Sequence, residues 1–92
     1  MYNLLMITIW CSAVTGGKTI KQIKLTSDAE DMNEGFLECM TKACKQFDIE
    51  MPMWHSKHTK QLNMFRKITF VQDDFIDRLP CDRFVVEITD FS

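Results

Sequence analysis

The pattern of hydrophobic and polar residues predicts a β-hairpin at the start of the chain. Residues 3–11 are rich in Leu, Ile, Met and Trp, and residues 19–26 mix Ile and Leu with lysines, so both segments are predicted to be strands. Gly16 and Gly17 lie between them and favour a tight turn, because glycine accepts positive φ angles. The first segment is apolar on both faces and is expected to be a central strand, whereas the second suits an edge.

A helix is predicted over residues 28–47, where apolar side chains recur at intervals of three and four residues. Ser27 and Glu30 have the spacing of a capping box at its start. Acidic residues gather in its first turns, where they stabilise the positive end of the helix dipole.

The second half of the chain predicts shorter elements. We expect a short helix, a strand, one or two helical turns and a final strand, at residues 58–65, 67–71, 73–79 and 84–89 respectively. The order ββα(α)β(α)β, with one main helix, indicates the α+β class. We therefore predict a small two-layer fold. The N-terminal β-hairpin belongs to a small mixed sheet, and the main helix (about 28–47) packs on one face of that sheet. Because 92 residues bury enough surface for one core, residues 1–92 are expected to form a single α+β domain.

Composition bears on the compartment. The chain is 46% hydrophobic and 26% charged, which is typical of a packed domain. Its four cysteines, at positions 11, 39, 44 and 81, are accompanied by no secretion signal, so reduced and mostly buried thiols are expected. Residues 1–14 are apolar but too short to span a bilayer, and they lack a basic leading region. We therefore expect a cytoplasmic protein that does not bind membranes.

Charge runs in blocks along the chain. Residues 1–25 hold three lysines and no acid, residues 26–50 hold seven acids and two lysines, residues 51–70 hold four cations and no acid, and residues 71–92 hold six acids and two arginines. The net charge of −2 argues against a protein that coats nucleic acid with its whole surface. The basic blocks can merge on one face, or each can be neutralised by an acidic neighbour.

The basic block at residues 54–67, here called the basic and aromatic segment, is the strongest candidate binding surface. Cations interleaved with rings suit single-stranded nucleic acid, in which phosphates meet Lys or Arg and bases stack on aromatics. The same composition suits a patch that binds an acidic protein. Alternatively, Trp54 and Phe65 belong to the core and the cations only solvate a helix. The candidate binding residues are Trp54, His55, Lys57, His58, Lys60, Arg66 and Lys67.

A structural zinc site is a further alternative, because imidazole and thiolate are the ligands that hold Zn²⁺ in a tetrahedron. His55 and His58 are three residues apart and would share one face of a helix. Cys39 and Cys44, however, are five apart and fall on different sides of the predicted helix. The competing interpretation is two exposed imidazoles and four buried thiols.

Two other patterns point to chemistry less specifically. Gly17, Lys18 and Thr19 resemble the end of a phosphate-binding loop, but Ser12 stands where that motif needs glycine, and a strand is predicted where it needs a helix. A plain hairpin turn explains these residues better. Among the cysteines, Cys81 is the one whose surroundings could be electropositive, yet no acid or base stands at a recognisable spacing from it.

The paired carboxylates Glu30-Asp31 and Asp73-Asp74 are interpreted as charges at helix starts, without a catalytic role. No catalytic residue, metal ligand, cofactor or small-molecule substrate is assigned. We expect a protein-interaction or self-associating module rather than an enzyme. Its partner would be another protein or a second copy, because an edge strand offers spare backbone donors and acceptors. Binding of single-stranded nucleic acid through residues 54–67 and a small structural zinc domain using His55/His58 are the alternatives.

Overall fold

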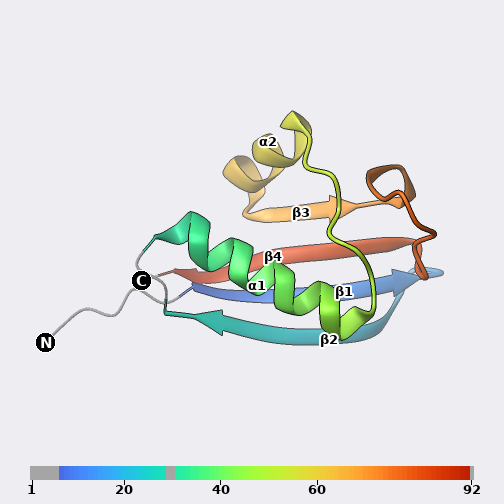
Figure 1. Cartoon of the computed structure of the whole chain (residues 1–92), viewed down its shortest axis with the longest axis horizontal. Helices are drawn as coiled ribbons and strands as arrows, with labels where there is room; N and C mark the ends of the chain where they lie inside the picture. Colours follow the sequence, from blue (N-terminus) through green and yellow to red (C-terminus); the bar gives the residue numbers. More distant parts are fainter. Residues whose placement is uncertain (1–6, 29–30, 92) are drawn as a thin grey trace, which may run out of the picture.

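The computed structural model describes residues 7–28 and 31–91, which form two layers. One layer is a four-stranded sheet and the other consists of two helices that cover one of its faces (Figure 1). The elements, in chain order, are β1 (Ile7–Thr15), β2 (Lys18–Ser27), α1 (Met32–Phe47), α2 (Ser56–Phe65), β3 (Lys67–Phe70), a 3₁₀ turn η1 (Gln72–Asp74) and β4 (Arg83–Phe91). The α+β class and the two-layer architecture predicted from the sequence are therefore confirmed.

The sheet has the order β2-β1-β4-β3, and every pair of neighbouring strands is antiparallel. The prediction of a mixed sheet was therefore wrong. A parallel pair needs a crossover connection between neighbouring strands. Both helices come between β2 and β3 in the sequence, and these two strands lie at opposite edges of the sheet, so no helix connects neighbouring strands. β1 is central and β2 lies at an edge, as their apolar and lysine-rich compositions predicted.

The predicted hairpin joins β1 to β2. Its turn residues Gly16 and Gly17 have φ angles of 60° and 78°, a left-handed conformation that glycine adopts without strain. The loop before β4 braces this turn, because Asp82 accepts a hydrogen bond from the Gly16 amide at 2.9 Å through its carboxylate. The Asp82 amide in turn donates to the Val14 carbonyl.

The core lies between the helices and the sheet. The inward residues of the sheet include Ile9, Cys11, Phe70, Phe84 and Val86, which are almost completely buried. They pack against the buried face of α1, which carries Cys39, Met40, Ala43 and Cys44. All four cysteines are free thiols. No helix in the described part of the chain is long and apolar enough to cross a membrane.

α1 starts later than the sequence predicted. Its N-cap is Asp31, whose carboxylate accepts a hydrogen bond from the Asn33 amide at 3.1 Å. Ser27 instead ends β2, and its hydroxyl donates to the Glu38 carboxylate. The expected capping box at Ser27 was therefore wrong, because the sheet continues through the residue that was to cap the helix. Its other member, Glu30, lies outside the described residues.

The predicted helical turns at residues 73–79 reduce to η1. Beyond it, side chains rather than a helix hold the backbone. Glu50 accepts hydrogen bonds from the amides of Ile76 and Asp77 at 2.5 and 2.6 Å. The Gln72 side chain bridges the Asp77 carbonyl and the Leu79 amide. These contacts position the loop that leads into β4.

Candidate functional sites

The basic and aromatic segment does not form one surface. Lys57 lies beside Asp74, at 3.7 Å between its Nζ and Oδ1. Lys67 belongs to β3 and projects onto the face of the sheet that carries no helix. Lys60 and Arg66 are exposed and form no ion pair with any residue in the described ranges. The cations of the segment are thus divided among three parts of the molecule. Lys57 is paired with Asp74, Lys67 lies on the sheet, and Lys60 and Arg66 lie at α2.

Both histidines of the segment lie next to a carboxylate that comes from η1. His55 is the N-cap of α2, and its Nε2 lies 3.6 Å from Asp74 Oδ1. His58 Nε2 lies 3.4 Å from Asp74 Oδ2. His58 and Asp74 are 0% and 1% exposed, so this pair belongs to the interior. We call His55, Lys57, His58 and Asp74 the His–Asp cluster.

Hydrogen bonds assign the tautomer of His58. Its Nδ1 accepts from the His55 amide at 2.9 Å, so the proton of a neutral ring resides on Nε2 and points toward Asp74. Asp74 Oδ2 also accepts from the Val71 amide at 3.0 Å. The Asp74 carbonyl accepts a hydrogen bond from the Met53 amide at 2.7 Å. Asp74 therefore connects the linker before α2 to η1.

The electrostatics of the cluster favour a neutral imidazole beside an ionised carboxylate. Burial lowers the pKa of His58 below its usual value, although the nearby Asp74 opposes that shift. Burial raises the pKa of Asp74, but the Val71 amide together with His58 and Lys57 outweighs it, so the net shift is downward. Both nitrogens of His58 face protein groups, since Nδ1 accepts from the His55 amide and Nε2 lies 3.4 Å from Asp74 Oδ2.

The expectation of two exposed imidazoles was therefore wrong for His58 and right for His55. His58 also contacts the core ring of Phe70, with ring centroids 4.7 Å apart. Sequence reasoning missed Asp74, which was interpreted only as a charge at a helix start. No local spacing could have revealed its partner, because His58 and Asp74 meet through tertiary packing.

Metal and thiol chemistry gain no support from the arrangement of these groups. Among the described residues, no group of three or more His, Cys, Asp or Glu side chains is arranged to hold a metal ion. Burial raises the pKa of Cys11 to about 12 and that of Cys44 to about 11. Burial also raises the pKa of the half-buried Cys81, whose thiol donates to the Arg83 carbonyl at 3.2 Å. A thiol in such surroundings is a poor nucleophile.

An apolar groove runs between α1, the linker before α2, and α2. It has a volume of about 450 Å³ and we call it the helix groove. Its lining residues are Asn33, Phe36, Leu37, Met40, Met51, Pro52, Trp54 and Leu62. Seven of these eight side chains are apolar, and the sequence did not predict the groove because three separate segments contribute them.

Trp54 forms one wall of the helix groove. Its ring meets Phe36 edge to face with centroids 6.0 Å apart, and its Nε1 donates to Thr59 Oγ1 at 2.8 Å. The side chain is nevertheless 45% exposed. Trp54 is thus a fixed surface aromatic, which is neither a core residue nor part of a cationic patch.

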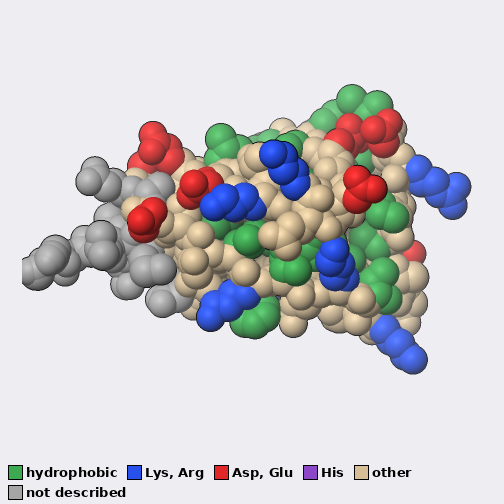
Figure 2. All heavy atoms as spheres, turned by 60° about the horizontal axis from the view of Figure 1, so that its bottom comes forward, with side chains coloured by type: hydrophobic (Ala, Val, Ile, Leu, Met, Phe, Trp, Pro, Cys, Tyr) green, Lys and Arg blue, Asp and Glu red, His purple; other side chains and the backbone are tan. Residues whose placement is uncertain are grey.

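The two edges of the sheet differ in how they are protected. At β3, the Gln61 side chain of α2 accepts a hydrogen bond from the Thr69 amide at 3.0 Å, so this outward donor is already satisfied. At β2, the exposed strand carries Lys18, Lys21 and Lys24, and edge lysines oppose pairing with a second strand. On the face that brings β2 forward, Lys and Arg side chains are spread out rather than gathered (Figure 2).

Comparison of the chain with protein-family models, with curated proteins and with solved structures finds no match.

Proposed function

We propose that this protein is a protein-interaction module whose helix groove binds an amphipathic segment of a partner protein. The observation that carries the proposal is the groove itself, an apolar concavity open to solvent on a chain of 92 residues. An exposed apolar surface with this shape is typical of sites that take the apolar face of a helix.

The residues of the groove suit this role. Trp54 is held in place by Phe36 and Thr59, so it offers a rigid aromatic anchor at little cost in conformational entropy. Met51, at 41% exposure, adds a flexible side chain that adapts to the shape of an incoming residue. Leu37, at 58% exposure, is accessible to a partner from solvent.

The apolar lining indicates the kind of occupant. Seven of the eight lining side chains are apolar, and none of the eight is charged. Glu38, which follows Leu37 in the sequence, has its carboxylate against Ser27 of β2 and beside Lys42. The proposed occupant is therefore an amphipathic segment that lays its apolar face in the groove.

The protected edges of the sheet support the groove over strand pairing. The Thr69 amide of β3 is occupied by Gln61, and β2 carries edge lysines. A cytoplasmic location belongs to the same proposal. It is supported by the four free thiols, since cysteines remain reduced in that compartment.

The test uses a defined probe, an 18-residue amphipathic peptide of Leu and Lys, in a Trp10→Phe background. Trp54 then reports binding by its fluorescence, because the chain has two tryptophans. We expect the peptide to bind and the double variant L37Q/M51Q to weaken binding about tenfold or more, because both substitutions replace apolar lining residues without changing charge.

The matched control is I20Q/I76Q, which changes two exposed apolar residues outside the groove, at 59% and 81% exposure. This variant should bind like the parent, and a peptide of the same composition in scrambled order should bind weakly to both. Equal losses in the two double variants would contradict the proposal. So would a dimer, detected by sedimentation, that L37Q/M51Q dissociates, because the occupant would then be a second copy.

A further inference from the structure

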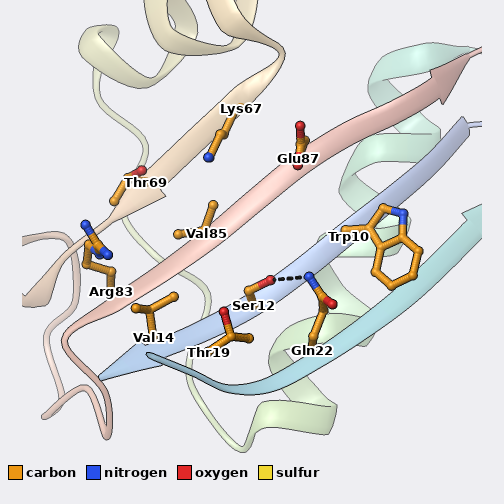
Figure 3. Close-up of a pocket in the computed structure, with 10 residues that line it drawn as sticks. All are labelled: Trp10, Ser12, Val14, Thr19, Gln22, Lys67, Thr69, Arg83, Val85 and Glu87. Carbon is orange, nitrogen blue, oxygen red and sulfur yellow. Dashed lines mark hydrogen bonds between the residues drawn. The ribbon is translucent and has the colours of Figure 1, made fainter. Parts of the chain in front are cut away.

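The face of the sheet opposite the helices carries a polar surface that the helix groove does not explain. Cross-strand register arranges it in rows. In one row Trp10 of β1 lies between Lys24 of β2 and Glu87 of β4, and Lys67 of β3 is opposite Glu87. A shallow pocket of about 290 Å³ lies over these strands (Figure 3). We call this surface the open sheet face.

The next rows supply groups that form hydrogen bonds. Ser12 of β1 is opposite Gln22 of β2, and the Gln22 amide donates to the Ser12 hydroxyl at 3.0 Å. Thr69 of β3 is opposite Val85 of β4. The polar groups therefore lie on both sides of an apolar strip, at positions that alternate with buried core residues along each strand.

Cations flank Thr69 on this face. Lys67 is opposite Glu87, and Arg83 lies four residues from Glu87 along β4. At ~3.4 Å per residue, the backbone positions of Arg83 and Lys67 are therefore about 14 Å apart. Figure 3 shows the Lys67 amine turned toward Thr69 and Val85, and the Arg83 guanidinium on the other side of Thr69. Neither cation forms an ion pair with a residue in the described part of the chain.

The aromatic group of this face belongs to β1, which lies next to the strand of Arg83, β4, and two strands from the strand of Lys67, β3. Trp10 presents its ring between β1 and β2, and Lys24 Nζ lies 5.9 Å from the ring centroid. A cation at that distance is attracted to the face of the ring. Among the described side chains of this face, Lys24, Lys67 and Arg83 outnumber the acid Glu87, although the whole chain carries a net charge of −2.

We infer that the open sheet face binds single-stranded nucleic acid. A phosphate occupies the space over Thr69 between Lys67 and Arg83, and a base stacks on Trp10. An aromatic platform beside a line of cations is the combination that single strands need, because every base has a flat apolar face and every linkage carries a negative charge. The surface is independent of the helix groove and shares only Lys67 with the basic and aromatic segment.

The experiment measures binding of labelled 12-residue oligothymidine and oligouridine in a Trp54→Phe background, in which Trp10 is the remaining tryptophan. We expect Trp10 fluorescence to be quenched on binding. Affinity should fall with salt at a logarithmic slope of about −1.5 to −2, because two to three phosphate contacts contribute ~0.7 each for single strands.

Three variants locate the site. K67E/R83E should weaken binding at least tenfold, and Trp10→Leu should weaken it about tenfold and remove the quenching signal. The matched control K60E/R66E makes the same change in net charge, at one position in α2 and at its C-cap, and should retain the parent's affinity. Circular dichroism of each variant verifies that it is folded, and a variant that unfolds is replaced by Lys67→Gln or Arg83→Gln.

Several outcomes would overturn the inference. These are no binding at low salt, equal losses in K67E/R83E and K60E/R66E, or binding without a change in Trp10 fluorescence. Polyglutamate serves as a competitor of a different class. If it displaces the oligonucleotide at matched charge, the open sheet face is a surface for acidic protein and the assignment to nucleic acid is wrong.

Discussion

The buried carboxylate of Asp74 determines where the side chains of three nearby basic residues lie. Its carboxylate lies within 3.7 Å of groups from His55, Lys57 and His58, and its carbonyl holds Met53. Burying a carboxylate costs free energy unless donors and positive groups surround it. The basic character of residues 55–58 is thus explained in part by the need to compensate one interior acid. His58 is buried by this arrangement, whereas the Lys57 side chain remains 54% exposed beside Asp74.

The His–Asp cluster predicts that stability falls as pH falls. The folded pKa values of His58 and Asp74 are both lowered, so the unfolded chain binds protons more readily than the folded one. The contribution of His58 is present above the ordinary histidine pKa of 6.5 and is lost as pH falls through its lowered folded pKa. That of Asp74 is lost below 3.8 in the same way.

Urea unfolding at several pH values between 8 and 5 measures this effect. We expect the free energy of unfolding of the wild type to decrease over that range, and His58→Gln to flatten the decrease. At pH 8 the variant should lose about 1–3 kcal/mol, because Asp74 and the His55 amide lose their partner. Lys60→Gln, at an exposed position of α2, should keep the wild-type slope; if it flattens the slope as well, His58 is not the source.

At the scale of elements, the pattern of apolar and polar residues predicted those helices, strands and turns that local sequence determines. The glycine turn, the lysine-rich edge strand, the short second helix and the alternating last strand all correspond to observed elements. The start of α1 could not be predicted from Ser27. Serine is a common N-cap residue, but here Ser27 is paired in β2 and its hydroxyl donates to Glu38. Tertiary pairing decided between the two, as it did for the antiparallel order of the strands.

β3 illustrates the same limit. Its four residues were predicted as a strand, but nothing local indicated that Gln61 would occupy the outward amide of Thr69. We predict that Gln61→Ala accelerates hydrogen exchange at the Thr69 amide, because that amide then faces water. The change should be at least tenfold and confined to the edge, while amides of β1 keep their protection. The control Asn63→Ala lies on the same helix and should leave Thr69 unchanged.

At the scale of the whole molecule, the described core is one unit that spans both layers. Cys11 of β1 and Cys39 and Cys44 of α1 belong to the same buried cluster. The helix groove and the open sheet face lie on opposite sides of this core, so each can be altered without reaching into the other. The sequence predicted neither surface, because each one combines residues that are distant along the chain.

Thiol labelling tests whether this core opens as one unit. The thiolate is the reactive species, and burial raises the pKa of all four cysteines. We expect an aromatic disulfide reagent to modify the partly exposed Cys81 first and the other three at one slower rate. Cys81→Ser should remove the first phase alone. Three different slow rates would contradict a core that opens cooperatively.

The pairing of β1 with β4 also bears on how the chain is made. Ile7 is aligned with Phe91, so the two central strands come from opposite ends of the described chain. During synthesis β1 and β2 can join early, whereas β4 leaves the ribosome after every other described element. Until then the inner edge of β1 has no partner strand, so its unpaired backbone groups and apolar residues form a surface that is prone to aggregation.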